Sequence, residues 1–189
     1  MSKTENYDIT TDIAILGAGP AGAGTSLFLS KAGIKHTIFD ATSFPRDKIC
    51  GDALSGKVVA TLKKLDPKLV DEMAAQEDKF LGSWGVSFIA PNNKRLDVPF
   101  KSERKPYDPA PGYITKRIDF DSFLIEKLNP VFADIHFNTK VRDVEYVENG
   151  VEISYEKNGK AGKAFAKRVV GAEGIRSVVA RKFAKHQGD

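Results

Sequence analysis

Cysteine is nearly absent from this sequence, which has Cys50 alone in 189 residues. A single cysteine excludes an intrachain disulfide framework and suits a reducing compartment. The three histidines are also isolated, because no cysteine, histidine or acidic group accompanies them at the spacing of metal ligands. The sequence therefore predicts a cytoplasmic protein with no metal site.

A strong excess of one charge is also missing. The net charge is +4, from 29 basic and 25 acidic residues, and 41% of the residues are hydrophobic. The basic residues after Lys157 alternate with apolar residues or flank glycines, a pattern typical of a solvated sheet edge and helix face. We therefore expect no nucleic-acid partner.

One long uncharged run is present, Ile13 to Ser30, whose 18 residues reach the lower limit for a membrane-spanning helix. Four glycines and a proline fall within residues 17–24, and these residue types weaken a helix interior. The preceding residues, "MSKTENYDITTD", contain three acidic residues and one lysine, which is the wrong flank for a secretory signal. The run is better explained as a strand, a tight turn and a helix.

The turn has the form G-x-G-x-x-G, from Gly17 to Gly22, between a predicted strand at Asp12–Leu16 and a helix that ends at Gly33. A second strand, His36–Phe39, ends in Asp40. Such glycines permit a sharp turn and a close approach of a pyrophosphate, and an acidic residue at this distance accepts from ribose hydroxyls. The alternative is a turn that binds nothing, but the whole arrangement predicts a dinucleotide site.

The remaining sequence predicts a mixture of helices and antiparallel strands. Helices are expected over Asp52–Leu65, from Pro67, and after Asp119 as N-cap. Two strands, Trp84–Phe88 and Leu96–Phe100, are expected to form a hairpin with one apolar face. A short strand is expected at Tyr113–Lys116, and a meander near the C-terminus at Val141–Val147, Val151–Tyr155 and Lys163–Val170. The closing residues predict a strand, a turn and the beginning of a helix. A parallel dinucleotide-binding unit joined to an antiparallel meander does not indicate a plain nicotinamide dehydrogenase. A short-chain dehydrogenase would also have a Tyr-x-x-x-Lys pair, and no tyrosine here has a lysine four residues later.

Four segments together resemble the geranylgeranyl reductase branch of the flavoproteins related to para-hydroxybenzoate hydroxylase. They are "ILGAGPAGAG" with Asp40, "PRDKICGDAL" from Pro45, "YITKRIDFDSFL" from Tyr113, and "VVGAEGIRSVVAR" from Val169. The resemblance spans essentially the whole chain and keeps the family's order of motifs. It implies an α/β fold: a Rossmann-like FAD-binding domain with a parallel sheet, an inserted antiparallel meander and part of a β-hairpin substrate region.

The resemblance also implies which residues contact the cofactor. The glycine turn would hold the FAD pyrophosphate, Asp40 the adenosine ribose, and Arg117 phosphate or ribityl oxygens. Glu173 stands where the family's second flavin motif usually has aspartate. The full set is Gly17, Ala18, Gly19, Pro20, Ala21, Gly22, Asp40, Arg46, Cys50, Gly51, Ala53, Arg117, Val141, Gly171, Glu173 and Gly174.

The implied activity is FAD-dependent reduction of isoprenoid C=C bonds, with NAD(P)H as electron donor and a lipid-linked substrate reached by peripheral contact with the inner face of the membrane. An FAD monooxygenase or halogenase is the alternative on the same scaffold. No catalytic proton donor is identified. Because family members run to about twice this length and carry a third flavin motif, we expect residues 1–189 to be an incomplete FAD/NAD(P)-binding domain, with 80–117 adding part of a substrate-side β region. An inactive truncated flavoprotein is a further alternative.

Three interpretations stay open at this level. Cys50 is either beside the flavin or a small buried hydrophobe. Arg46 is either a cation on the phosphate side or a surface charge. The apolar hairpin face is either part of a substrate wall or ordinary core.

Overall fold

The computed structural model describes residues 7–50, 52–103, 105 and 108–184. The chain forms two compact units. The first comprises the residues up to Arg46 and those from Asp121 onward, and the second is Asp47–Phe120. The predicted dinucleotide turn and the C-terminal meander therefore belong to the first unit, and the predicted hairpin belongs to the second.

The first unit is built on a six-stranded sheet with the order β8-β2-β1-β11-β10-β9. Strands β8, β2, β1 and β11 run parallel to their neighbours, whereas β11, β10 and β9 form an antiparallel meander. The strands are β1 (Ile9–Leu16), β2 (His36–Phe39), β8 (Ala133–His136), β9 (Thr139–Val147), β10 (Gly150–Lys157) and β11 (Lys160–Gly171). The predicted α/β class with parallel and antiparallel parts is confirmed, and β11 belongs to both parts.

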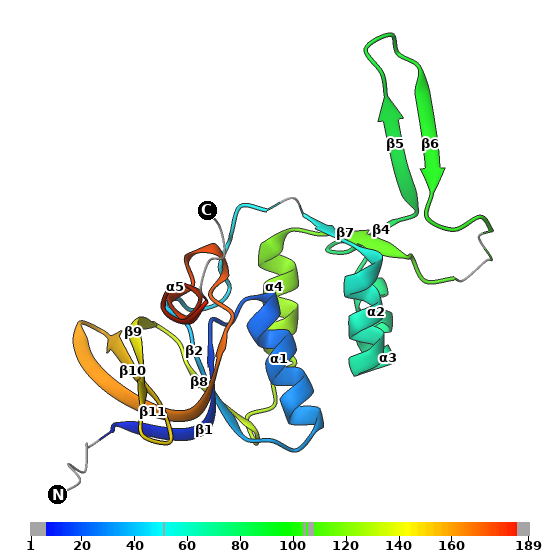
Figure 1. Cartoon of the computed structure of the whole chain (residues 1–189). Coiled ribbons are helices and arrows are strands. Elements are labelled where there is room, and N and C mark those ends of the chain that lie inside the picture. The colour runs from blue at the N-terminus through cyan, green and yellow to red at the C-terminus, as the bar shows by residue number, and fades with distance from the viewer. Residues whose placement is uncertain (1–6, 51, 104, 106–107, 185–189) are drawn as a thin grey trace, which may run out of the picture. The chain divides into compact units, whose positions relative to one another are not determined.

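Helices α1 (Pro20–Lys31) and α5 (Val178–Phe183) of this unit follow the strands that carry the motifs, whereas α4 (Arg117–Glu126) continues from the second unit into the first (Figure 1). Helix α1 follows β1 and ends before Gly33, whose φ of +73° supports the predicted termination. A short 3-10 turn (Gly174–Arg176) and α5 follow β11. Helix α4 begins at Arg117, so the predicted N-cap role of Asp119 is wrong. Asp119 lies instead in the first turn, where a carboxylate meets the positive end of the helix.

The sheet curls, so that its two ends approach each other. The backbone N–H of Thr139, which begins the edge strand β9, donates to the carbonyl of Asp40 after β2, at 2.8 Å. The rings of Phe39 and Tyr155 lie 5.8 Å apart between centroids. The core residues enclosed in this way are Ala14, Leu16, Phe39, Val144, Val151, Ile153, Tyr155, Ala164, Ala166 and Val178. Burial of this cluster holds the end of β2 beside the start of β9.

The second unit contains two helices and two small sheets. The elements are β3 (Ala53–Leu54), α2 (Gly56–Leu65), α3 (Pro67–Ala74), β4 (Leu81–Ser83), β5 (Gly85–Ile89), β6 (Arg95–Pro99) and β7 (Gly112–Ile114). The predicted helix from Asp52 is wrong over its first residues, because Ala53 and Leu54 pair with β7 and α2 begins only at Gly56. The predicted helix at Pro67 is confirmed, and Asp66 caps it by accepting from the N–H of Lys68 at 3.0 Å.

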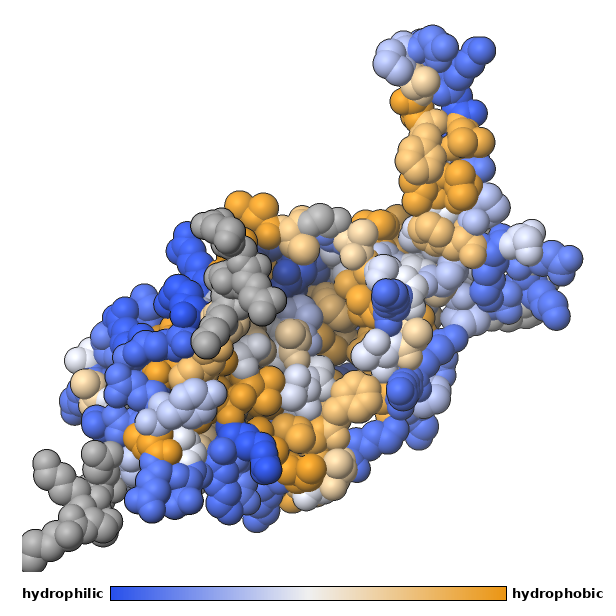
Figure 2. Space-filling model, viewed as in Figure 1, coloured by the Kyte–Doolittle hydropathy of each residue, from blue (hydrophilic) through white to orange (hydrophobic). Residues whose placement is uncertain are grey.

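Strands β5 and β6 form the predicted hairpin, and they pair only with each other among the described strands. Opposed pairs alternate between an apolar face and a more polar face, which also carries Ile89. The polar face joins Ser87, Asp97 and Arg95 by hydrogen bonds. The apolar side chains are 43–63% exposed; they are Val86, Phe88, Leu96, Val98 and Phe100. The interpretation of this face as ordinary core is therefore wrong, and Figure 2 shows apolar side chains gathered along the hairpin.

None of the helices in the described part of the chain is long and apolar enough to cross a membrane. The uncharged run Ile13–Ser30 is divided among β1, the glycine turn and α1, as its glycines predict.

Candidate cofactor site

The turn between β1 and α1 is possible only with glycine at two positions. Gly17 has φ of +99°, and a methyl group there would lie 2.5 Å from the carbonyl oxygen of Ala172. A methyl group on Gly22 would lie 1.8 Å from the carbonyl oxygen of Gly17. The first glycine therefore permits the reversal, and the second permits the helix to begin against the strand.

Gly19 has a different role, because its surroundings are open. It is the N-cap of α1 and has no side chain to occupy the first turn, and Pro20 follows at the position where its missing N–H costs nothing. Among the described residues, a methyl group on Gly19 would meet within 4 Å only the Arg46 guanidinium, 3.6 Å away. The amino end of α1 thus faces a space bordered by a cation. That arrangement suits an anionic group.

Asp40 lies directly beside this turn and is 7% exposed. Its Oδ2 accepts from the N–H of Ala18 at 2.7 Å, and its Oδ1 accepts from the N–H and hydroxyl of Thr42 at 2.9 and 2.8 Å. The carboxylate therefore ties the end of β2 to the glycine turn. Thr42 was not predicted as a site residue; the D-x-T spacing, typical of a local side-chain turn, is the signal that could have found it.

Arg46 completes the edge of the site. Its guanidinium lies 3.7 Å from Asp40 Oδ2 and is 4.8 Å from the centroid of the Phe44 ring. Its Nε is buried, and no described residue accepts a hydrogen bond from it. This guanidinium has a donor without an acceptor and lies next to the open side of Gly19. It fits a pyrophosphate, because a pyrophosphate supplies several acceptor oxygens. The site therefore fits the FAD phosphates that the sequence predicts.

The second predicted motif lies against the first. Gly171 ends β11 opposite Leu16 in the parallel register, and the N–H of Ala172 donates to the Leu16 carbonyl at 2.8 Å. Glu173 accepts from the hydroxyl of Ser177 at 2.7 Å and from the N–H of Val178 at 3.0 Å. Motifs from opposite ends of the sequence thus meet at the carboxyl ends of adjacent parallel strands, where open α/β sheets bind ligands.

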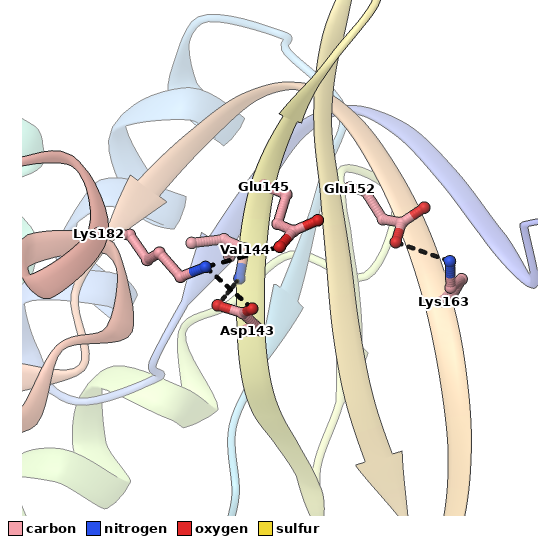
Figure 3. Close-up of polar contacts among 6 residues, drawn as sticks. All are labelled: Asp143, Val144, Glu145, Glu152, Lys163 and Lys182. Carbon is pink, nitrogen blue, oxygen red and sulfur yellow. Dashed lines mark hydrogen bonds and ion pairs between the residues drawn. The ribbon is translucent and has the colours of Figure 1, made fainter.

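Helix α5 is held on its other side by the meander, as Figure 3 shows. The Lys182 ammonium lies 3.0 Å from Asp143 and 3.6 Å from Glu145, both on β9. The hydrogen bond between Lys182 and Asp143 lowers the pKa of that carboxyl and raises the pKa of the ammonium. On the neighbouring strands Glu152 pairs with Lys163 at 2.8 Å. The segment after β11 is therefore attached to the sheet at its start, through Ala172, and at its end, through Lys182.

The other predicted cofactor residues are placed as follows. Val141 lies in β9 two residues after Thr139, whose N–H bonds to Asp40, so it belongs to the same neighbourhood. Cys50 is exposed, and its interpretation as a buried hydrophobe is wrong. Ala53 is exposed in β3, and Arg117 is half-buried at the start of α4. Gly51 lies outside the described residues.

Cys50, Ala53 and Arg117 all belong to the second unit. Their contact with the cofactor stays a prediction. No group of three or more histidine, cysteine or acidic side chains in the described ranges is arranged to hold a metal ion.

Residues 10–187 match the FAD binding domain family, and the chain belongs to that family. The match supports the predicted FAD cofactor and, at the level of the family, the prediction of a flavin-dependent enzyme. The fold agrees as well. A flavoprotein/dehydrogenase structure from Cytophaga hutchinsonii has a TM-score of 0.78 at 23% identity, covering 92% of this chain and 42% of that one. The monooxygenase PieE in complex with FAD and substrate has a TM-score of 0.77 at 19% identity, covering 93% and 32%.

Curated relatives catalyse different reactions. A 1H-pyrrole-2-carbonyl-[peptidyl-carrier protein] chlorinase of Pseudomonas fluorescens is 29% identical over 94% of this chain and 42% of its own length. A menaquinone reductase of Mycolicibacterium smegmatis is 28% identical, over 90% and 39%. A digeranylgeranylglycerophospholipid reductase of Methanococcus vannielii is 26% identical, over 89% and 39%. The chain thus spans about two fifths of the length of these relatives.

Proposed function

We propose that this chain is the FAD-binding part of a reductase that acts on isoprenoid C=C bonds. The observation that carries the FAD assignment is the meeting of the Gly17–Gly22 turn, Asp40, Arg46 and the second motif at one edge of the parallel sheet. The "PRDKICGDAL" and "YITKRIDFDSFL" segments favour the reductase branch. The similarity to the lipid reductase of Methanococcus vannielii supports the same choice.

The residues of the site bind and orient the cofactor. The amino end of α1 and the backbone of Gly19 would hold the pyrophosphate, and Arg46 would neutralise part of its charge with the Nε that is otherwise unused. Asp40 would accept from a ribose hydroxyl through the lone pair that Ala18 leaves open on Oδ2. Bound FAD supplies hydride-transfer chemistry, with NAD(P)H proposed as the source of electrons.

The hairpin of the second unit is the candidate surface for an apolar substrate. Its apolar face carries Val86, Phe88, Leu96 and Val98, which are 43% exposed or more, whereas its opposite face joins Ser87, Asp97 and Arg95 with one apolar side chain, Ile89. An isoprenoid chain has no hydrogen-bonding groups, so such a face would bind it by burying hydrocarbon alone. A lipid-linked substrate would bring the protein into peripheral contact with a membrane.

Two alternatives rest on separate observations. A halogenase or monooxygenase is supported by the 29% identity to the Pseudomonas fluorescens chlorinase. A flavoprotein fragment without activity of its own is supported by the coverage of about two fifths of the relatives' length.

Gly19→Ala tests the cofactor site without disturbing the fold. Its φ of −65° suits alanine and a methyl group finds open space, so we expect normal folding but FAD affinity weakened by about tenfold or more. Flavin absorbance retained after desalting, and titration of FAD fluorescence, measure the effect. Gly24→Ala is the matched control, because it lies within α1, beyond the glycine turn, and a methyl group there meets none of the described residues within 4 Å. Equal affinity in wild type and Gly19→Ala would contradict this placement of the pyrophosphate.

The reaction is tested with the FAD-loaded chain, chemically reduced under nitrogen, and a geranylgeranyl-bearing lipid. Mass spectrometry should show addition of hydrogen across the double bonds. A chlorinated pyrrole product, formed with oxygen and chloride, would support the halogenase instead. FAD binding without any product would favour the inactive fragment.

A further inference from the structure

We infer that Glu173 is a positioning residue, which acts on FAD binding by capping α5 and so holding the second motif against the glycine turn. The inference rests on the proposed FAD site. It differs from the role expected by resemblance, in which the acidic residue of this motif contacts the cofactor itself.

The two motifs are packed so closely that their shapes depend on each other. A methyl group on Gly17 would lie 2.5 Å from the Ala172 carbonyl oxygen and 3.0 Å from the Cα of Glu173. The backbone of the second motif therefore forms one wall of the glycine turn. A shift of this backbone would either open the turn or push it toward the space that the pyrophosphate needs.

The Glu173 side chain bonds to residues at the start of α5. One carboxylate oxygen accepts from the Ser177 hydroxyl at 2.7 Å, and the other accepts from the N–H of Val178 at 3.0 Å. Ser177 in turn accepts from the N–H of Ala180 at 3.1 Å as N-cap of α5. The carboxylate thus satisfies donors at the beginning of the helix and closes the loop that Gly174 reverses with φ of +77°.

The far end of α5 is anchored to β9. Lys182 contacts Asp143 and Glu145, and the Phe183 ring lies 4.1 Å from that of Tyr146 between centroids. Because the meander holds α5 in place, the bonds from Glu173 to the start of α5 fix the backbone of Ala172. The Ala172 backbone in turn limits where Gly17 can lie. Without the cap, FAD would have to order this loop on binding, which lowers affinity.

Substitutions at Glu173 distinguish positioning from direct contact. Glu173→Asp introduces the residue usual in the family, but shortens the side chain by one methylene. If Glu173 acts by capping, Asp weakens FAD binding roughly five- to tenfold, as expected for a lost helix cap. Glu173→Gln, which keeps an acceptor oxygen for the N–H of Val178 and an amide for Ser177, should retain most of the affinity.

Hydrogen exchange of the FAD-free chain should respond to substitution of Glu173 if this residue caps α5, but not if it only contacts the cofactor. The N–H groups of Val178 and Ala180 should lose protection in Glu173→Asp before any cofactor is added, and recover in Glu173→Gln. Glu148→Gln removes an exposed glutamate in the turn after β9 and is the control for charge alone. Equal or tighter FAD binding by Glu173→Asp, with unchanged protection, would overturn the inference. Failure of the wild type to bind FAD would instead overturn the proposed function together with this extension of it.

Discussion

At the scale of single residues, the buried pair Ser26 and His36 shows how one side chain determines the state of another. His36 Nδ1 lies 2.9 Å from the carbonyl oxygen of Ile34, so Nδ1 carries the hydrogen. Nε2, 2.7 Å from the Ser26 hydroxyl, then accepts from it. Both residues are at most 2% exposed. The pair therefore joins α1 to the start of β2.

Ser26→Ala should destabilise the chain by about 1–3 kcal/mol, because it leaves a buried imidazole nitrogen without its donor. Urea unfolding followed by circular dichroism measures the change in the free energy of unfolding. Ser30→Ala on the same helix is the matched control, since the buried Ser30 hydroxyl has no hydrogen-bond partner among the described residues. That control should be neutral or stabilising. Equal effects of the two substitutions would show that the Ser26–His36 bond contributes nothing.

At the scale of helices and strands, the sequence predicted the meander strands, because the residues between them are typical of hairpin turns. The meander strands are joined at Asn149, Asn158 and Gly159, all with positive φ, within the segments "ENG" and "EKNGKAG". Strand β8 was not predicted. Its four residues, Ala133–His136, have too short a pattern, and they become a strand by pairing with the open edge of β2.

The exposed hairpin gives a prediction at this scale. Phe88→Thr should leave the free energy of unfolding almost unchanged, because Phe88 is 58% exposed and threonine suits a strand. Phe80→Ala, in the same unit, removes a side chain that is 2% exposed and should cost about 3–5 kcal/mol. Chemical denaturation of both variants tests the comparison. A large cost for Phe88→Thr would show that another surface covers this face.

At the scale of the whole molecule, the chain divides into two units, and the predicted cofactor contacts are divided between them. The glycine turn, Asp40, Arg46 and the second motif belong to the first unit, whereas Cys50, Ala53 and Arg117 belong to the second. The single tryptophan, Trp84, is also in the second unit and reports on its unfolding.

FAD at one hundred times its dissociation constant should stabilise the unit that binds it by about 2.7 kcal/mol. If Cys50, Ala53 and Arg117 contact the cofactor as predicted, the transition seen by Trp84 fluorescence shifts together with that seen by circular dichroism. A shift confined to the circular dichroism transition would place the whole site in the first unit and contradict these three contacts. Riboflavin, which lacks the pyrophosphate and adenosine, is the control ligand.

The sequence by itself determined the features that depend on local chemistry. Glycine at positions 17 and 22, the short strands on either side of α1, and the end of that helix at Gly33 follow from residues close to one another in the chain. Steric freedom, apolar periodicity and helix termination act over a few residues, so they can be read without knowing what lies nearby.

Only the tertiary structure decided which groups meet and which surfaces stay uncovered. The β1–β11 register places Ala172 against Gly17, and the bonds of Glu173 turn an expected cofactor ligand toward α5. The apolar alternation of β5 and β6 predicted a covered face equally well, yet Phe88 and Leu96 are exposed. Burial and hydrogen bonding depend on partners distant in the sequence, because they arise only when the strands have assembled into a sheet.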